Sequence, residues 1–294
     1  MKNIVNKKNY FAGWYFKNMN ENNTIAFIPS YHIDNKGKLS GSLQVITDDS
    51  SYNFEYLFNE FYLDNKNLFI KLGNSEFSER GINVNIKTDD IEIKGNLAYS
   101  TLKPPKYDVM GPLCAVPFLQ CRHWLLSFQH SVNGTLEING KKYQFNDGIG
   151  YLEKDSGKSF PKKYLWTQCN IKGENDCTIM LSIATVKVLF INFEGTICSI
   201  YFQGKEYRLA TYLGAKIIEN KQNYAKIKQG NLVFSAEQLT ERAHDLKAPI
   251  NGLMARTIRE SLSCEVRYLL VKDEKVIFDL TSERAGFEYS DTNL

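Results

Sequence analysis

The chain has 294 residues, and its 36 Lys and Arg against 33 Asp and Glu give a formal net charge of +3 at pH 7. Apolar residues make up 43% and charged residues 23%, which excludes a disordered, collagen-like or disulfide-scaffold protein. The balanced charge also argues against a nucleic-acid-binding surface. At about 150 residues per domain, the length favours two domains. The unusual value is the aromatic content of 13%, because aromatic residues favour strands and also line apolar ligand pockets.

The cysteines and the N-terminal segment bear on the cellular compartment of the protein. The six cysteines form no CxxC pair and match no common zinc spacing. The segment MKNIVNKKNYFAGWYFK lacks the apolar run of a signal peptide, and no stretch reaches the roughly 18 apolar residues of a membrane span. We therefore expect a cytoplasmic protein with reduced cysteines, in contact with a membrane only peripherally, if at all.

Apolar and polar residues alternate through most of the chain, which predicts short antiparallel strands. The expected strands are 42–47, 83–87, 90–94, 134–138, 177–183, 186–194, 196–202, 206–212, 253–270 and 275–280. Between two alternating runs, Asn139-Gly140 predicts a tight hairpin turn. Short helices are expected only at 236–240, with Ser235 as the cap, and around 116–121.

Strands in two successive groups, without βαβ alternation, predict an all-β fold of two antiparallel β-barrels or sandwiches. The same pattern argues against a Rossmann or TIM fold. The sequence also contains no GxGxxG, GxxxxGK[ST] or GxSxG motif.

Two aromatic segments interrupt this pattern. The stretch Tyr10–Lys17 holds five aromatic residues within seven positions. We interpret it as a first strand, in which Trp14 either plugs a barrel or forms a pocket wall with Tyr15. The second segment is Tyr31-His32, after an apolar run. A histidine at a strand end can donate a proton or orient a ligand, and it can equally be structural.

A third segment contains two acidic residues, Glu153 and Asp155, that are two positions apart. In an extended chain they lie on one face. Two carboxyl groups that share an apolar site push one pKa upward, which makes a general acid at neutral pH. The alternative is a solvated turn with Lys154 and Lys158 as partners.

Two histidines upstream of this segment are candidates for metal ligands or catalytic partners. His123 and His130 are seven positions apart, so on one continuous strand they face opposite sides, which argues against a joint metal site. A dyad of Cys121 and His123 has no third residue to orient it.

Three motifs in the chain resemble those of the tocopherol cyclase family, in family order and across almost the whole sequence. They are Tyr10-Phe11-x-Gly13-Trp14-Tyr15-Phe16-Lys17, the run from Gly150 to Pro161 continued by Trp166-x-Gln168-Cys169-Asn170, and Leu246-Lys247-Ala248-Pro249 with Gly252 and Glu260-Ser261. Two positions depart from the family pattern. Ala12 stands where the family usually has Glu, and Ser156 where it usually has Trp. Because either side chain could line the pocket, the substrate could differ from a tocopherol precursor.

The resemblance implies two lipocalin-like antiparallel β-barrels in tandem, over residues 1–158 and 159–294. It also implies cofactor-free, acid-catalysed cyclisation of a prenylated phenol or quinol, in which an alkene is protonated and a hydroxyl captures the cation. The acid would be Asp155 or Glu153, with His32 or His123 as the base or orienting group. The expected substrate-binding residues are Trp14, Tyr15, Tyr31, Arg122, Tyr151, Trp166 and Gln168.

Several alternatives stay open at this point. Arg122 either binds a polar head group or pairs with a carboxylate inside a barrel. The protein could also be a lipocalin-like carrier of an apolar ligand, or an isoprenoid alkene hydratase. In each case we expect a prenyl-lipid-like small molecule as the partner, and neither a metal nor another cofactor.

Overall fold

The structure is a computed structural model that describes residues 7–116, 119–173, 176–188 and 191–292. Nearly all of its regular structure is β-strand, which confirms the predicted all-β class. The short 3-10 helices are η1 (Phe58–Glu60), η2 (Gly111–Ala115) and η3 (Thr211–Leu213). None of the helices in the described residues has the length and hydropathy needed to span a membrane.

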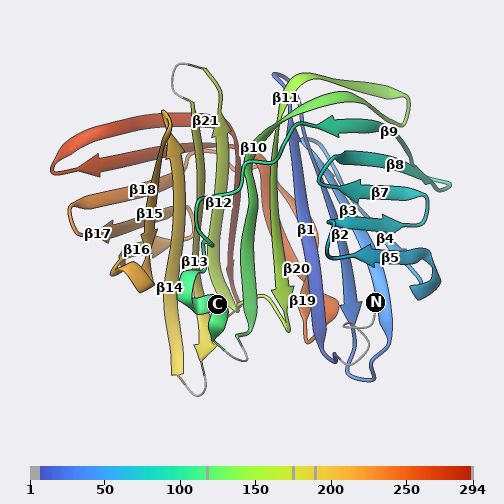
Figure 1. Cartoon of the computed structure of the whole chain (residues 1–294), viewed down its shortest axis with the longest axis horizontal. Helices are drawn as coiled ribbons and strands as arrows, with labels where there is room; N and C mark the ends of the chain where they lie inside the picture. The colour runs from blue at the N-terminus through green and yellow to red at the C-terminus, as the bar shows by residue number, and fades with distance from the viewer. Residues whose placement is uncertain (1–6, 117–118, 174–175, 189–190, 293–294) are drawn as a thin grey trace. The chain divides into compact units, whose positions relative to one another are not determined.

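The first sheet has eleven antiparallel strands in the order β4-β3-β2-β1-β11-β10-β9-β8-β7-β6-β5 (Figure 1). Their bounds are β1 (Tyr10–Met19), β2 (Thr24–Ile33), β3 (Leu39–Thr47), β4 (Ser51–Tyr56), β5 (Phe61–Asp64), β6 (Phe69–Leu72), β7 (Ser75–Ser78), β8 (Gly81–Lys87), β9 (Glu92–Tyr99), β10 (Cys121–Ile138) and β11 (Lys141–Gly157). Side chains from almost all of these strands meet in one apolar core, so the sheet curls around it as a barrel.

The second sheet has the order β15-β14-β13-β12-β21-β20-β18-β17-β16, and β19 pairs with β20. The bounds are β12 (Lys163–Ile171), β13 (Cys177–Val188), β14 (Ile191–Phe202), β15 (Lys205–Ala210), β16 (Lys216–Lys221), β17 (Tyr224–Gln229), β18 (Leu232–Gln238), β19 (Ala243–Ile250), β20 (Leu253–Lys272) and β21 (Lys275–Asp291). This sheet also surrounds an apolar core of its own.

The chain forms two compact units that exchange segments. Unit 1 takes residues up to 104, together with 125–159 and 247–256, and unit 2 takes 105–124, 160–246 and the remainder. One crossing between the units lies beside the boundary predicted after residue 158. The segment 105–124 belongs to unit 2, although the predicted boundary places it in the first domain. The segment 247–256 belongs to unit 1, although the boundary places it in the second domain. Whether 1–158 and 159–294 fold as separate domains stays a prediction.

The predicted hairpin is confirmed, since Asn139 and Gly140 join β10 to β11. Their φ angles are 48° and 80°, and both lie in the left-handed region that a two-residue type I′ turn requires. This turn sets the start of the β10–β11 pairing, on which the position of the candidate site depends.

The predicted helix at 236–240 is wrong, because residues up to Gln238 belong to strand β18. Ala236 pairs with Tyr268 of β20 and is fully buried, so sheet pairing prevails over the local helix propensity. The other predicted helix falls partly on Pro117 and Phe118, which lie outside the described residues. The same is true of Leu189 and Phe190 in the predicted strand 186–194, whose ends belong to β13 and β14.

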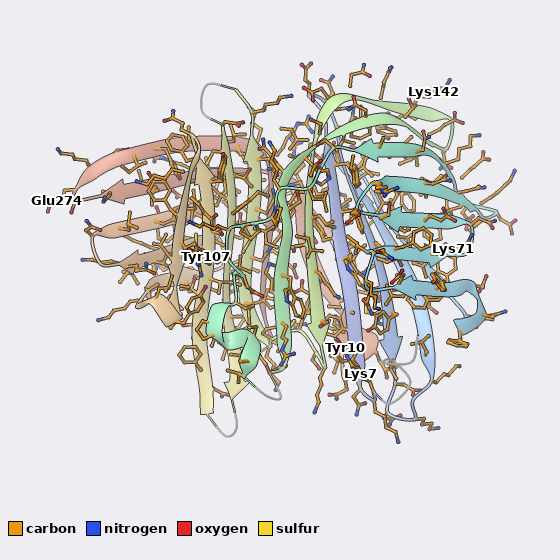
Figure 2. The ribbon with its side chains drawn as sticks, in the orientation of Figure 1. Lys7, Tyr10, Lys71, Tyr107, Lys142 and Glu274 are labelled. Carbon is orange, nitrogen blue, oxygen red and sulfur yellow. The ribbon has the colours of Figure 1, made fainter. Side chains whose placement is uncertain are left out.

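Many charged side chains lie on the outer surface of the sheets, although a few, such as Lys17 and Glu153, are buried. Figure 2 shows Lys71, Lys142 and Glu274 pointing away from the ribbon. Lys7 lies beside Tyr10 instead, with its amine 3.6 Å from the centre of the ring, a cation–π contact.

At Gly95 the backbones of β9 and β10 approach so closely that a larger side chain would not fit. Its φ is 135°, and a Cβ atom there would lie 2.2 Å from the carbonyl oxygen of Thr135. We expect Gly95→Ala to lower the free energy of unfolding by about 3 kcal/mol or more. The control is Gly140→Ala, at φ 80° with no atom within 4 Å of the new Cβ, which should cost about 1 kcal/mol. Equal small losses in urea unfolding would contradict this packing.

Candidate active site

Glu153 and Asp155 point to the same face of β11. In the pairing with β1, Glu153 lies opposite Tyr15 and Asp155 opposite Gly13. Between them, Lys154 lies opposite Trp14, which belongs to the apolar core of unit 1. Because side chains alternate along a strand, the two acidic residues occupy the face opposite the core. The same-face geometry expected from their spacing is therefore present.

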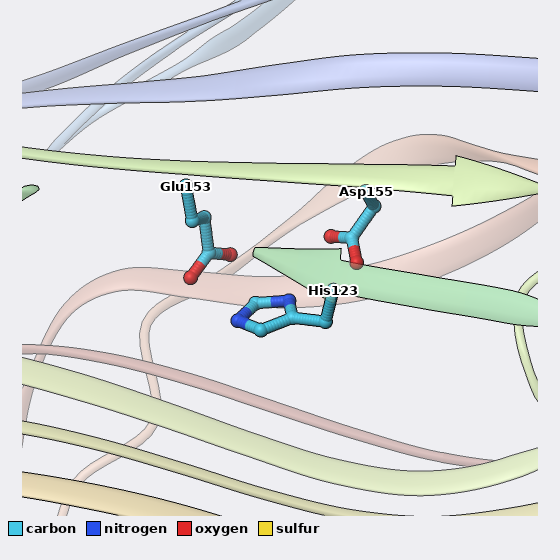
Figure 3. Close-up of side chains that lie close together, drawn as sticks. All are labelled: His123, Glu153 and Asp155. Atoms are coloured by element: carbon cyan, nitrogen blue, oxygen red, sulfur yellow. The ribbon is translucent and has the colours of Figure 1, made fainter. Parts of the chain in front are cut away.

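His123 of β10 lies close to both carboxyl groups (Figure 3). One nitrogen of His123 and one oxygen each of Glu153 and Asp155 lie within 4.8 Å of one another. β10 and β11 are neighbours in the first sheet, and Glu153 is buried while the other two side chains are half-buried. Three of the four predicted catalytic residues are therefore brought together.

One imidazole and two carboxylates are also a donor set that metal ions accept. If the protein binds a metal ion here, His123, Glu153 and Asp155 would hold it. The spacing of His123 and His130 along the sequence argues against a joint metal site of the two. In the structure His130 has other neighbours. Its ring centre lies 4.4 Å from that of Tyr99. The expectation that no metal takes part stays a prediction.

Tyr151 holds one of the two carboxyl groups in place. Its hydroxyl donates a hydrogen bond of 2.5 Å to Oε2 of Glu153, and its side chain is fully buried. Burial, and then the charge of Glu153, raise the pKa of Tyr151 well above its ordinary value. The phenol therefore keeps its proton at neutral pH and stays a hydrogen-bond donor to Glu153.

His32 belongs to a different hydrogen-bond network. Its Nε2 lies 2.9 Å from the hydroxyl of Ser42 and 3.1 Å from that of Ser30, and the two hydroxyls are 2.8 Å apart. Its Nδ1 is buried and has no hydrogen-bond partner among the described residues. Burial lowers the pKa of His32 to about 4, so the ring is neutral at pH 7. The structure thus groups His32 with two serines rather than with the acidic residues.

Trp14 and Tyr31, two of the expected pocket walls, lie in the core of unit 1. Their ring centres are 6.3 Å apart, and Nζ of Lys154 lies 4.7 Å from the centre of the Trp14 ring. Burial, followed by the charge of Lys7, lowers the pKa of Lys154 to about 8. Alternation along β1 puts Trp14 on the core face and Tyr15 on the face of the two acids. That Trp14 and Tyr31 bind the substrate stays a prediction.

The remaining predicted residues lie in unit 2. Arg122 donates from Nη2 to the carbonyl oxygen of Val116 at 3.2 Å. Gln168 is fully buried and donates from Nε2 to Oδ1 of Asn170. Its Oε1 has no hydrogen-bond partner in the described part of the chain. Trp166 is 7% exposed, so it contributes to a buried face of β12.

Sequence reasoning missed a second tyrosine–glutamate pair, in unit 2. The hydroxyl of Tyr164 donates to Oε1 of Glu288. Glu288 lies opposite Glu260 across β20 and β21, and both are buried. Tyr151 and Glu153 are two positions apart, so the sequence alone predicts that they share one face of a strand. Tyr164 and Glu288 are 124 positions apart, so only the fold brings them together.

Solved structures share this fold over nearly the whole chain. Kievitone hydratase from Nectria haematococca aligns with a TM-score of 0.54 and 12% identity, covering 97% of this chain and 90% of that one. CghA, solved with Sch210972, aligns with a TM-score of 0.57 and 10% identity, covering 95% and 87%. The fold therefore defines an all-β protein of two lipocalin-like antiparallel barrels.

Sequence comparison then gives the family. The model described as tocopherol cyclase-like matches residues 76–290, which include Tyr151, Glu153 and Asp155. Since this is more than half of the chain, the protein belongs to the tocopherol cyclase-like family. The matched region begins after the aromatic N-terminal motif and His32.

Two curated plant relatives match over a shorter stretch. "Probable tocopherol cyclase, chloroplastic" from Oryza sativa subsp. japonica is 28% identical over 109 residues, which are 35% of this chain and 23% of that protein. "Tocopherol cyclase, chloroplastic" from Zea mays is 24% identical over 121 residues, or 40% and 25%. The alignments thus span about a quarter of each relative's length.

The lowered pKa of His32 makes stability depend on pH. Between about pH 6.5 and pH 4 the unfolded chain binds a proton at His32 and the folded chain does not. The free energy of unfolding is therefore undiminished above about pH 6.5 and falls as the pH drops towards 4, by up to about 3 kcal/mol from this residue.

Urea unfolding at pH 7 and pH 4.5 measures this effect. His32→Gln should lose less stability between the two pH values than the native chain does. Burial also lowers the pKa of His130 to about 4, so the double variant with His130→Gln should flatten the dependence further. The assignment fails if His32→Gln loses as much stability as the native chain over this range.

Proposed function

We propose that this protein catalyses the cofactor-independent, acid-catalysed cyclisation of a prenylated phenol or quinol. The observation that carries the proposal is the pair Glu153 and Asp155, two carboxyl groups on one face of β11 with oxygens within 4.8 Å. Family membership supports it, as do the two plant relatives named tocopherol cyclase.

The pair would supply the proton that starts the reaction. An alkene carbon is a very weak base, so its protonation needs a carboxylic acid shielded from water. The proton leaves the carboxyl oxygen and forms a C–H bond at the less substituted alkene carbon, which leaves a tertiary cation. Tyr151 contributes by fixing the orientation of the Glu153 carboxyl group.

Ring closure completes the step and restores the acid. The phenol oxygen forms a C–O bond to the cation and then loses its proton. His123 lies within reach of both carboxyl groups, so it is the proposed base, and passing the proton back to the carboxylate balances the reaction. Tyr15, opposite Glu153 on β1, would shield the cation with its aromatic face.

Hydration is the second candidate, favoured by the match to kievitone hydratase over 97% of this chain. It would use the same carboxyl pair, but water would capture the cation in place of the phenol. The expected partner in either case is a prenyl-lipid-like molecule. A cytoplasmic location with peripheral membrane contact is part of the same proposal.

Product mass distinguishes these functions. The purified protein is incubated with a geranylated hydroquinone, and the extracted lipid is analysed by mass spectrometry. We expect an isomer of unchanged mass with a new retention time. A gain of one water would indicate hydration, and recovery of only the starting compound would indicate a carrier and contradict the proposed catalysis.

Variants identify the proton donor. Asp155→Asn and Glu153→Gln each remove one carboxyl group, and loss of a general acid lowers turnover by about 10²- to 10⁴-fold. The control is Glu137→Gln, which removes an acid of β10 that pairs with Lys94 and should keep native turnover. Circular dichroism checks that each variant folds. Full turnover in both acid variants would show that the donor lies elsewhere.

A further inference from the structure

Unit 1 contains a cavity of about 980 Å³ that the proposed reaction does not use. It lies among the β2–β3 turn, the connection from β4 to β5, and the first residues of β20. Pockets that bind small molecules typically measure roughly 300–1,000 Å³. The size of this cavity therefore suits a lipid-sized ligand.

One side of the cavity is apolar and exposed. Leu57, Phe58 and Leu253 line it, with 65%, 56% and 50% of their surfaces exposed. Single exposed apolar residues are ordinary, but several around one cavity are typical of a binding site. These three side chains would cover the apolar body of a ligand.

The polar lining includes His32 and Ser42. Only 4% of the His32 surface is exposed, and its Nδ1 lacks a hydrogen-bond partner among the described residues. A buried polar atom without a partner lowers the stability of the folded chain. Nε2 lies within hydrogen-bond distance of the serine hydroxyls, so His32 and Ser42 give this part of the lining neutral hydrogen-bonding groups.

The charges around the cavity argue against an ionic ligand. Asp34, Glu55 and Lys38 line it, which leaves one acidic charge in excess and disfavours an anion. Oδ1 of Asp34 already accepts the backbone N–H groups of Lys36 and Lys38, each at 2.8 Å. This carboxylate is therefore satisfied without a cationic partner.

We propose that this cavity binds an uncharged amphipathic molecule, with its hydroxyl or carbonyl group beside His32 and Ser42 and its apolar body along Leu57, Phe58 and Leu253. The site uses none of the carboxyl groups of the proposed reaction. It would therefore exist even if that reaction were disproved.

Titration calorimetry of the whole chain with 1-dodecanol, dodecanoate and dodecylammonium tests the proposal, at submicellar ligand concentrations. We expect saturable binding of one dodecanol, at least tenfold tighter than that of dodecanoate. His32→Leu should weaken dodecanol binding about tenfold, which corresponds to the loss of one hydrogen bond. No saturable binding, or tighter binding of dodecanoate or dodecylammonium, would overturn the proposal.

Surface variants keep the test independent of any folding defect in His32→Leu. Leu57→Ser with Phe58→Ser removes exposed apolar side chains of the cavity and should weaken dodecanol binding at least tenfold. The control is Leu213→Ser, which changes a leucine of η3 that is 46% exposed and lies outside the cavity. Equal affinities of the double variant and the control would contradict the proposed site.

Discussion

The pairing of β1 with β11 is the constraint on which the rest of the site depends. Backbone hydrogen bonds place Trp14 opposite Lys154 and Tyr15 opposite Glu153, which decides which side chains enter the core of unit 1. A slip of one residue would exchange the two faces. It would turn Glu153 and Asp155 into an apolar core, where an unpaired carboxylate is very costly. The core therefore maintains the register that brings the two acids together on the opposite face.

The same division into faces explains why the polar residues form separate groups. The acidic pair and Tyr151 form one group on β11, while His32 is hydrogen-bonded to serines on β2 and β3. A buried tyrosine donates to a glutamate in each unit, Tyr151 to Glu153 and Tyr164 to Glu288. Such neutral donors orient a carboxyl group without adding a positive charge, which suits a group that must give up a proton.

Local sequence pattern predicted the features that depend on neighbouring residues, such as the turn at Asn139 and the shared face of Glu153 and Asp155. It missed the short strands β4 to β7, which are only four to six residues long. The helix expected at 236–240 was wrong, since so short a segment cannot hold a helix against sheet pairing. The position of Trp14 relative to the acids required the β1–β11 register, and the partners of His32 required the β2–β3 register.

The central claim is that a carboxyl group on β11 transfers a proton to an alkene carbon. Turnover of a geranylated hydroquinone in D₂O tests it directly, because a proton delivered to carbon does not exchange afterwards. The account predicts a cyclic product that carries one non-exchangeable deuterium at the former alkene carbon. It also predicts that this product is absent when Glu153→Gln and Asp155→Asn are combined. A cyclic product without that deuterium, or an unchanged yield from the double variant, would contradict the account.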